Sequence, residues 1–214
     1  MNRRATYDDL VAAPEHLIAE IIDGRLLTRH MPSPIESITM MRLGAELERC
    51  YGCRKARNAE YPAPAASSPN ETLGEAAPTP SYLFLWKPEL HLGEDVVVPT
   101  MAAWTKSRIR SPMLDTWFGF PYPEWIAEIV AHSAPVYELE AKLGIYARAG
   151  IAHYWFIDPW ELRLDAYELV ERTWLLRGRY RGSDVVRAAP FKAATFPVCD
   201  LLPRRYRDAT NQEV

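Results

Sequence analysis

The spacing of apolar residues divides the chain into strand-like and helix-like segments. Two apolar runs within residues 17–29 flank Asp23-Gly24, a dipeptide typical of tight hairpin turns. Residues 34–50 repeat apolar side chains at helical intervals, with charged side chains between them. We therefore expect a hairpin followed by a helix, preceded by a short helix that begins with a capping sequence at Thr6.

The middle of the chain carries three short apolar runs. They cover residues 82–86, 89–92 and 95–98, and Gly93-Glu94 lies between the last two. Short runs of this kind, separated by turn residues, are typical of strands in an antiparallel arrangement. We expect them to form an antiparallel meander.

A strand, a helix and a second strand follow in the last third of the chain. Residues 125–131 form an apolar run, residues 137–149 have helical periodicity ending at Gly150, and residues 153–157 are apolar again. Such a unit predicts two parallel strands with a right-handed crossover. Partial alternation over residues 161–180 predicts an antiparallel edge hairpin, so the sheet should be mixed.

One long segment lacks large apolar side chains. Residues 59–80 are rich in Ala, Pro, Ser and Glu and bury too little surface to offset the entropy of ordering them. We expect a flexible loop there, within a single domain spanning residues 1–214. A composition of 48% hydrophobic and 25% charged residues supports one globular core.

Charge and cysteine content narrow the functional classes. The formal net charge of −3 gives no global signature of a nucleic-acid binder, so contact with DNA would need a local basic patch. Cys50 and Cys53 have zinc-ligand spacing, but no second pair completes a tetrahedral site, and we interpret them as incidental thiols. We expect a cytoplasmic protein without a membrane span.

Glu128 is the most informative residue, because it lies inside an otherwise apolar strand. A buried carboxylate is costly unless it is paired, protonated or bound to a metal. Hydrolysis of a phosphodiester needs a divalent cation held by carboxylates, together with a lysine that orients the nucleophile. Along this chain Glu20, the strand end at Thr100, Glu128 and Lys142 follow one another in an order that matches a known plan.

Several segments together resemble the bacterial Uma-two family of restriction-endonuclease-like proteins, within the PD-(D/E)xK superfamily. The resemblance spans about residues 7–202. It is carried by Ala19-Glu-Ile-Ile-Asp-Gly24, Arg42-Leu-Gly-Ala-Glu-Leu47, Pro88-Glu-Leu-His-Leu-Gly-Glu-Asp-Val-Val-Val-Pro99, Glu128-Ile-Val, Lys142-Leu-Gly-Ile-Tyr-Ala-Arg148 and Tyr154-Trp-Phe-Ile-Asp-Pro159. It implies an α/β restriction-endonuclease-like fold, in which helices flank a mixed sheet, and a Mg²⁺-dependent DNA endonuclease activity.

The resemblance also assigns roles to individual residues. It implies that Glu128 and Glu20 are the metal-binding acids and that Lys142 is a catalytic lysine moved from the strand to the following helix. Glu138 falls where the family has Asp, one turn before Lys142. Thr100 falls where the family has the Asp of its Pro-Asp motif.

Thr100 is the main departure from the family pattern. A neutral hydroxyl is a poor Mg²⁺ ligand, so metal affinity should be weakened. Asp95 lies about 16 Å upstream along the strand and on its opposite face, so it is no substitute. Either the site works through Glu128 and Glu20, with help from Glu89 or a water, or the protein is an inactive pseudonuclease that serves as an interaction or dimerisation module.

Each site residue also has a simpler interpretation. Glu128 could be a structural acid paired with Lys142 or Arg148. Lys142 could be a solvated helix residue paired with Glu138, and Glu20 could face water beside its turn.

DNA and a second copy of the chain are the candidate partners. Plain nucleic-acid binding would use a basic cluster made of Arg3, Arg4, Arg42, Arg49, Arg54, Lys55 and Arg57. His132 could line a cleft or be an ordinary loop residue. Stacking on bases could involve the aromatic residues Trp104, Trp117, Phe118, Phe120, Tyr122 and Trp125, although burial against the sheet or a dimer partner explains them as well.

Overall fold

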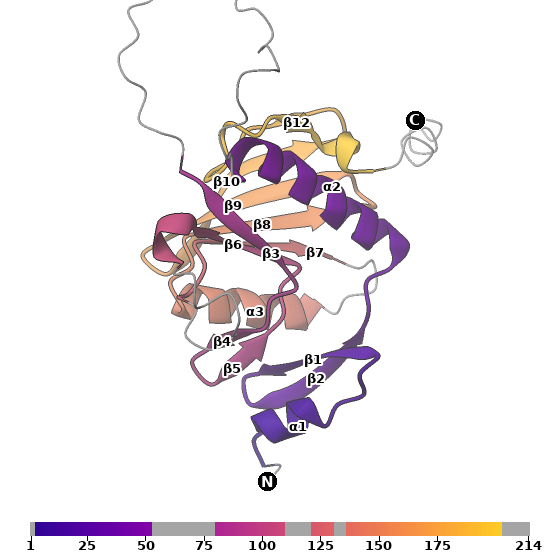
Figure 1. The fold of residues 1–214 in the computed structure, drawn as a ribbon, viewed down its shortest axis with the longest axis vertical. Helices are drawn as coiled ribbons and strands as arrows, with labels where there is room; N and C mark the ends of the chain where they lie inside the picture. The colour runs from indigo at the N-terminus through magenta and orange to yellow at the C-terminus, as the bar shows by residue number, and fades with distance from the viewer. Residues whose placement is uncertain (1–2, 53–79, 110–120, 131–135, 203–214) are drawn as a thin grey trace, which may run out of the picture.

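A computed structural model of the chain describes residues 3–52, 80–109, 121–130 and 136–202. Two sheets dominate it (Figure 1): a six-stranded sheet in the order β10-β9-β8-β7-β6-β3 and a four-stranded sheet in the order β2-β1-β5-β4. Their strands are β1 (Leu17–Ile22), β2 (Arg25–His30), β3 (Tyr82–Trp86), β4 (Leu90–Leu92), β5 (Asp95–Val97), β6 (Met101–Thr105), β7 (Trp125–Ile129), β8 (His153–Asp158), β9 (Arg163–Val170) and β10 (Thr173–Arg181).

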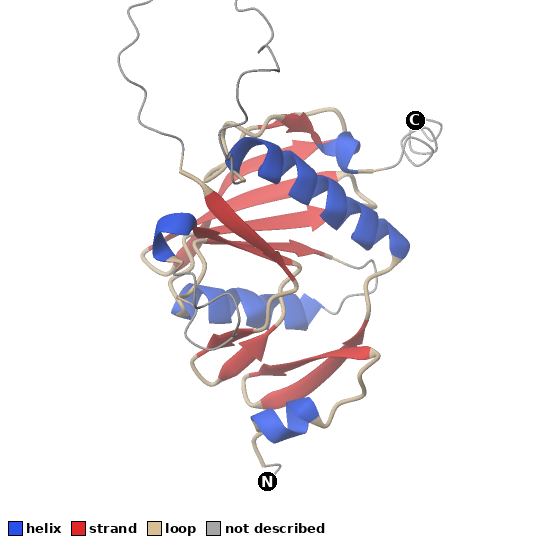
Figure 2. Cartoon of the chain, in the orientation of Figure 1, coloured by secondary structure: helices blue, strands red, loops and turns tan. Residues whose placement is uncertain are grey.

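Helices accompany both sheets (Figure 2). The α-helices are α1 (Tyr7–Val11), α2 (Pro34–Tyr51) and α3 (Val136–Arg148). A small two-stranded sheet of β11 (Val185–Val186) and β12 (Phe196–Pro197) and the short 3₁₀ helices η1 (Lys106–Arg108) and η3 (Val198–Leu201) complete the described elements. Among the described residues, no helix combines the length and the apolar character needed to cross a membrane.

The central sheet is mixed, as the sequence predicts. Strands β7 and β8 pair in parallel, and α3 connects them, whereas the other neighbours in this sheet are antiparallel. Gly150, at a φ of +73°, follows the end of α3 in the left-handed conformation that glycine adopts without strain. The predicted strand-helix-strand unit is therefore confirmed.

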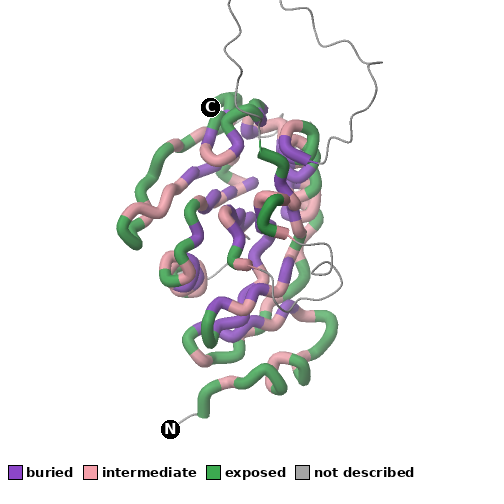
Figure 3. Tube along the Cα trace, turned by 60° about the vertical axis from the view of Figure 1, so that its left-hand side comes forward, coloured by how far each residue is buried: buried purple, intermediate pink, exposed green. Residues whose placement is uncertain are grey.

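Helices α2 and α3 cover different faces of the central sheet. Leu43 and Leu47 of α2 pack in a core with Trp125 and Trp155 of the sheet. Ile145 and Tyr146 of α3 pack instead with Ile126, Tyr154 and side chains of the smaller sheet. Figure 3 shows the buried segments concentrated in the central strands, with α1 at the exposed end of the molecule. Helix α3 therefore lies where the two sheets meet.

The predicted turns form through residues in the left-handed conformation. Asp23 and Gly24 have φ values of +49° and +76° between β1 and β2, and Glu171 and Arg172 have φ values of +48° and +63° between β9 and β10. Two consecutive positive φ angles are the signature of the turn that suits a tight hairpin. Both predicted hairpins are confirmed.

The predicted antiparallel meander is wrong in part. Strands β4 and β5 do pair, but β3 pairs with β6, over residues 101–105, where we predicted no strand. Met101 to Trp104 are buried on both faces of the sheet, so they show no alternation of apolar and polar residues. Lys87, at a φ of +48°, and Pro88 turn the chain out of β3 and into the other sheet. Most of the predicted loop at residues 59–80 lies outside the described residues.

Candidate active site

Four residues from four parts of the chain meet where α3 lies between the two sheets. Glu20 comes from β1, Glu128 from β7 and Lys142 from α3, and Thr100 immediately precedes β6. All four are buried. The structure thus brings together every site residue that the sequence singled out.

Lys142 joins the two acids. Its Nζ lies 2.9 Å from Glu20 Oε1 and 2.6 Å from Glu128 Oε1, and only 5% of its side chain is exposed. The interpretation of Lys142 as a solvated lysine paired with Glu138 is therefore wrong. So is that of Glu20 as a residue facing water, since 1% of its side chain is exposed.

Glu128 receives hydrogen bonds on both carboxylate oxygens. Tyr146 donates its hydroxyl to Oε1 at 2.7 Å, and Thr100 donates its backbone N–H and its Oγ1 hydroxyl to Oε2, each at 3.2 Å. Thr100 Oγ1 in turn accepts the backbone N–H of Ile129 at 3.1 Å. The hydroxyl at position 100 therefore acts as a donor to Glu128, where a motif carboxylate would be a second anion.

Glu20 is held by the smaller sheet and by a second cation. The backbone N–H of Val98 donates to Glu20 Oε1 at 2.6 Å, and Arg29 Nε donates to Oε2 at 3.3 Å. Arg29 also donates through Nη2 to the carbonyl of Val98 at 2.8 Å. Each of the four carboxylate oxygens of Glu20 and Glu128 therefore has at least one protein donor.

The formal charges of the cluster cancel. Two carboxylates, on Glu20 and Glu128, face two cations, on Lys142 and Arg29. Burial alone would raise the pKa of Glu20, but the charges of Lys142 and Arg29 outweigh it, and the pKa lies below its usual value. Burial likewise opposes the charge on Lys142, and the two carboxylates overcome it and raise the pKa of the ammonium group.

Two neighbours of the cluster have a raised pKa. Burial and the negative charge of Glu128 raise the pKa of Tyr146 well above its usual value, so the hydroxyl stays protonated and donates. Burial, followed by the charge of Glu20, raises the pKa of Glu138. Glu138 is thus near enough to interact with the cluster electrostatically.

Sequence reasoning assigned no role to Arg29 or Tyr146. Tyr146 lies four residues after Lys142, on the same face of α3, so helical spacing could have identified it. Leu27 is the partner of Glu20 in the hairpin register, and Arg29 lies two residues further along the same face. The proximity of Arg29 to Glu20, as a diagonal cross-strand pair, can be predicted once the register is known.

Other candidate residues lie elsewhere. Asp95 accepts hydrogen bonds from the backbone N–H of Asp23 and from Arg148, so Arg148 is not the partner of Glu128. Glu89 accepts a hydrogen bond from the hydroxyl of Tyr7. His132 lies outside the described residues.

Each described member of the predicted basic cluster has a partner within the protein. Arg3 pairs with Asp9 and Arg4 with Glu94, whereas Arg42 donates to the carbonyls of Asp200 and Leu202. Arg49 pairs with Glu46, and Arg54, Lys55 and Arg57 lie outside the described residues.

The remaining predicted groups are mostly structural or undescribed. Trp104 and Trp125 are fully buried, and Tyr122 is 42% exposed. Trp117, Phe118, Phe120 and Cys53 lie outside the described residues. Cys50 donates its thiol to the carbonyl of Ala193. In the described ranges, no three His, Cys, Asp or Glu side chains are grouped closely enough to hold a metal ion.

Comparison with known proteins identifies a family, and four chains of solved structures match. The model of the Uma2 family, described as "Putative restriction endonuclease", matches residues 69–198. A crystal structure from Anabaena variabilis ATCC 29413, described as a putative nuclease belonging to DUF820, is similar with a TM-score of 0.66 at 16% identity, covering 95% of this chain and 99% of that chain. No curated protein matches. The structural similarity confirms the predicted nuclease-like α/β fold.

Proposed function

Because the chain belongs to the Uma2 (Uma-two) family of restriction-endonuclease-like proteins, we propose that it derives from Mg²⁺-dependent DNA endonucleases and has a damaged active site. One observation carries the proposal. Thr100 stands where the family resemblance expects an aspartate, and its hydroxyl donates to Glu128 at 3.2 Å. The position where the family has a negatively charged side chain instead carries a neutral hydroxyl, which donates a hydrogen bond to Glu128.

The residues at this site do not fit a firmly held Mg²⁺ ion. Mg²⁺ prefers a full shell of oxygen ligands, which in proteins include one or two free carboxylates. Here Lys142 Nζ lies between Glu20 and Glu128, within 2.9 Å of both, and Arg29 contacts Glu20 as well. The two acids are already neutralised, so the cluster offers no excess negative charge to a divalent cation.

An aspartate at position 100 would change this balance. Its carboxylate would lie beside that of Glu128, and two like charges at that separation repel each other unless a cation is bound between them. The cluster would then carry a net formal charge of −1. We infer that one substitution accounts for most of the lost metal affinity.

The chain retains the other parts that the endonuclease plan requires. Glu128 and Glu20 are the candidate metal-binding acids, and Lys142 is the lysine that would orient a nucleophile near them. Tyr146 keeps Glu128 in place through its hydroxyl, 2.7 Å from Oε1.

A pseudonuclease is the second candidate function, and the closed charge network favours it. Every oxygen of Glu20 and Glu128 has a protein donor, and the network ties β1 of one sheet to β7 of the other through α3. A network with this structural role would persist without catalysis, and the protein would then act as an interaction or dimerisation module.

Plasmid nicking tests the proposal. Supercoiled DNA is incubated with Mg²⁺ or Mn²⁺ and the native chain, Thr100→Asp, or Thr100→Asp combined with Glu128→Ala. We expect little or no nicking by the native chain, a gain of at least about tenfold for Thr100→Asp, and loss of that gain in the double variant. Robust metal-dependent nicking by the native chain would show that the site is intact. A Thr100→Asp variant without any gain would favour the pseudonuclease.

A further inference from the structure

A row of side chains crosses four strands of the central sheet, starting at Glu128. In register, Glu128 of β7 faces Phe156 of β8, Phe156 faces Asp165 of β9, and Asp165 faces Arg179 of β10. Register partners on adjacent strands point to the same face of a sheet. The row therefore lies on the face that carries the Glu128 cluster, and its far end is about 14 Å away, at three strand spacings of about 4.8 Å.

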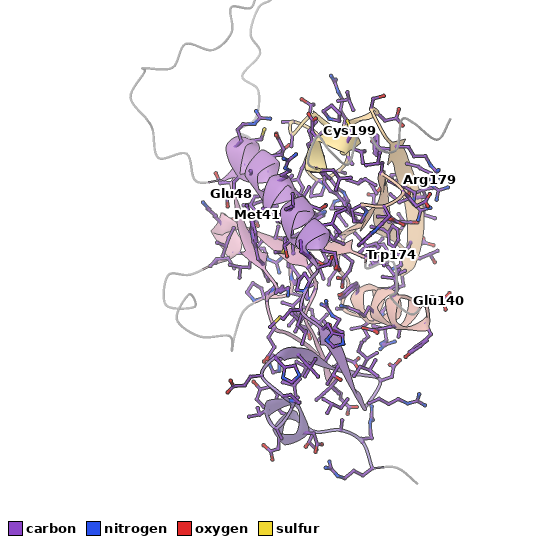
Figure 4. All side chains as sticks on the ribbon, turned by 90° about the vertical axis from the view of Figure 1, so that its right-hand side faces the viewer. Met41, Glu48, Glu140, Trp174, Arg179 and Cys199 are labelled. Atoms are coloured by element: carbon purple, nitrogen blue, oxygen red, sulfur yellow. The ribbon has the colours of Figure 1, made fainter. Side chains whose placement is uncertain are left out.

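Arg179, at the end of the row, is fixed by Asp165 and exposed to solvent. Its Nε and Nη2 donate to the two oxygens of Asp165 at 2.8 and 2.9 Å, a two-point pairing that fixes the plane of the guanidinium group. Asp165 is 3% exposed, whereas the side chain of Arg179 is 48% exposed. Figure 4 shows Arg179 at the outer side of the sheet, with α2 on the other side of the view.

Arg163 lies next to Arg179 and is only partly satisfied. Its guanidinium carbon is 5.2 Å from the centre of the Phe156 ring. Its Nη2 lies 3.9 Å from Asp158 Oδ2 and its Nε lies 3.9 Å from Asp165 Oδ2, and both distances are too long for a hydrogen bond. Its buried Nε has no hydrogen-bond partner among the described residues. A buried donor left without a partner is uncommon and calls for an explanation.

Asp158 does not fully compensate Arg163. Asp158 Oδ1 already accepts the backbone N–H groups of Trp160 and Glu161, each at 3.0 Å. Arg163 and Arg179 both approach Oδ2 of Asp165, at 3.9 and 2.9 Å. The guanidinium groups of Arg163 and Arg179 thus share the buried carboxylate of Asp165.

We propose that Arg163 and Arg179 form a binding site for the phosphodiester backbone of DNA, flanking the Glu128 cluster. The proposal rests on the proposed function, since it supplies contacts that would hold a DNA strand beside that cluster. A phosphate has the oxygens to pair with both arginines. Arg163 covers the face of the Phe156 ring, so this ring face is not free to stack on a base. The proposed site therefore contacts backbone phosphates and does not distinguish between bases.

Binding without cleavage tests this site separately from the damaged one. The affinity of the full chain for a fluorescently labelled DNA duplex is measured by anisotropy in EDTA, over a range of salt concentrations. Arg163→Gln removes the cation and leaves Arg179 on Asp165. Arg177→Gln is the matched control, because Arg177 lies on β10, as Arg179 does, but pairs with Glu168, on the opposite face of β9 from Asp165.

We expect Arg163→Gln to weaken binding about tenfold at about 0.1 M salt and to reduce the salt slope by about 1, the effect of losing one phosphate contact. Arg177→Gln should change affinity by less than about twofold. Arg179→Lys, which keeps the charge but loses the fork, should weaken binding with a nearly unchanged slope. Melting curves confirm that each variant is folded.

Two results would overturn the site. One is a native chain that does not bind the duplex at low salt, and the other is equal weakening by Arg163→Gln and Arg177→Gln. If Arg163→Gln does not fold, Arg163→Lys replaces it, with the expectation given for Arg179→Lys. A Thr100→Asp variant that stays inactive while Arg163 still governs binding would favour the pseudonuclease and leave the DNA site standing.

Discussion

Lys87 is a strained and poorly paired cation close to the site. It has a φ of +48°, a conformation that side chains other than glycine rarely adopt, and its backbone N–H donates to the carbonyl of Thr100 at 3.1 Å. Its Nζ contacts Met31 Sδ at 3.7 Å. Burial, followed by the charge of Arg29, lowers the pKa of Lys87 to about 8.

This pKa predicts a specific dependence of stability on pH. Between pH 8 and the ordinary lysine value of 10.5, Lys87 is neutral in the folded chain and protonated in the unfolded chain. The unfolded state then binds more protons, so stability rises with pH in that window. We expect the free energy of unfolding of the native chain, relative to Lys87→Met, to increase by about 1 kcal/mol from about pH 7 to pH 10, a value reduced because the side chain is partly solvated.

Urea unfolding at several pH values measures this difference. Lys192→Met is the control, since it makes the same chemical change at an exposed position. A native-minus-variant difference that stays constant from about pH 7 to pH 10 would contradict the assigned environment of Lys87.

At the scale of residues, the sequence predicts the site members but not their contacts. Glu20, Thr100, Glu128 and Lys142 were identified through their order along the chain and the family resemblance. Spacing alone cannot show that the Lys142 side chain reaches two carboxylates on different sheets. That contact depends on how α3 packs, which is a property of the tertiary structure.

At the scale of elements, α3 couples the two sheets through one buried cation. Lys142→Met preserves the length of the side chain but leaves Glu20 and Glu128 without the ammonium group between them. Removing one member of a buried ionic network typically costs about 3–5 kcal/mol, because uncompensated charge remains buried. We expect a loss of stability of that size in urea unfolding.

The exposed Lys192→Met change serves again as the comparison, and it should cost less than about 0.5 kcal/mol. A loss below about 1 kcal/mol for Lys142→Met would mean that water or a dissolved cation replaces the lysine easily. Such a result would contradict the structural role of the network.

The local signals in the sequence decide which elements could be predicted. The hairpin β1–β2 was predicted because Asp23-Gly24 separates two apolar runs, and β9–β10 was predicted because apolar and polar residues partly alternate over residues 161–180. Strand β6 was missed because it is buried on both faces and has no alternation. The predicted partner of β3 was wrong because proximity in the sequence favours β4. The chain instead passes from one sheet to the other at Lys87 and Pro88.

At the scale of the whole molecule, the fold was predictable and the state of its site was only partly so. The ordered motifs predict a mixed α/β nuclease-like architecture, and the similarity to the Anabaena variabilis structure, with a TM-score of 0.66, agrees with it. The proposed DNA-binding surface could not be located from the sequence, because the N-terminal and α2 arginines that the sequence singled out pair with other groups of the chain. The proposed DNA-binding arginines come from β9 and β10, which only the sheet register brings into line with Glu128.

Calorimetric titration of Mg²⁺ and Mn²⁺ into the native chain, Thr100→Asp and Thr100→Asn tests the central claim most directly. Asparagine matches the size of aspartate without its charge, so the comparison isolates the carboxylate. We expect metal binding at least about tenfold tighter for Thr100→Asp than for the other two, because only that variant gives the Glu128 cluster an excess negative charge. Equal metal affinity for the native chain and Thr100→Asp, or for Thr100→Asp and Thr100→Asn, would contradict a site damaged by the loss of one acid.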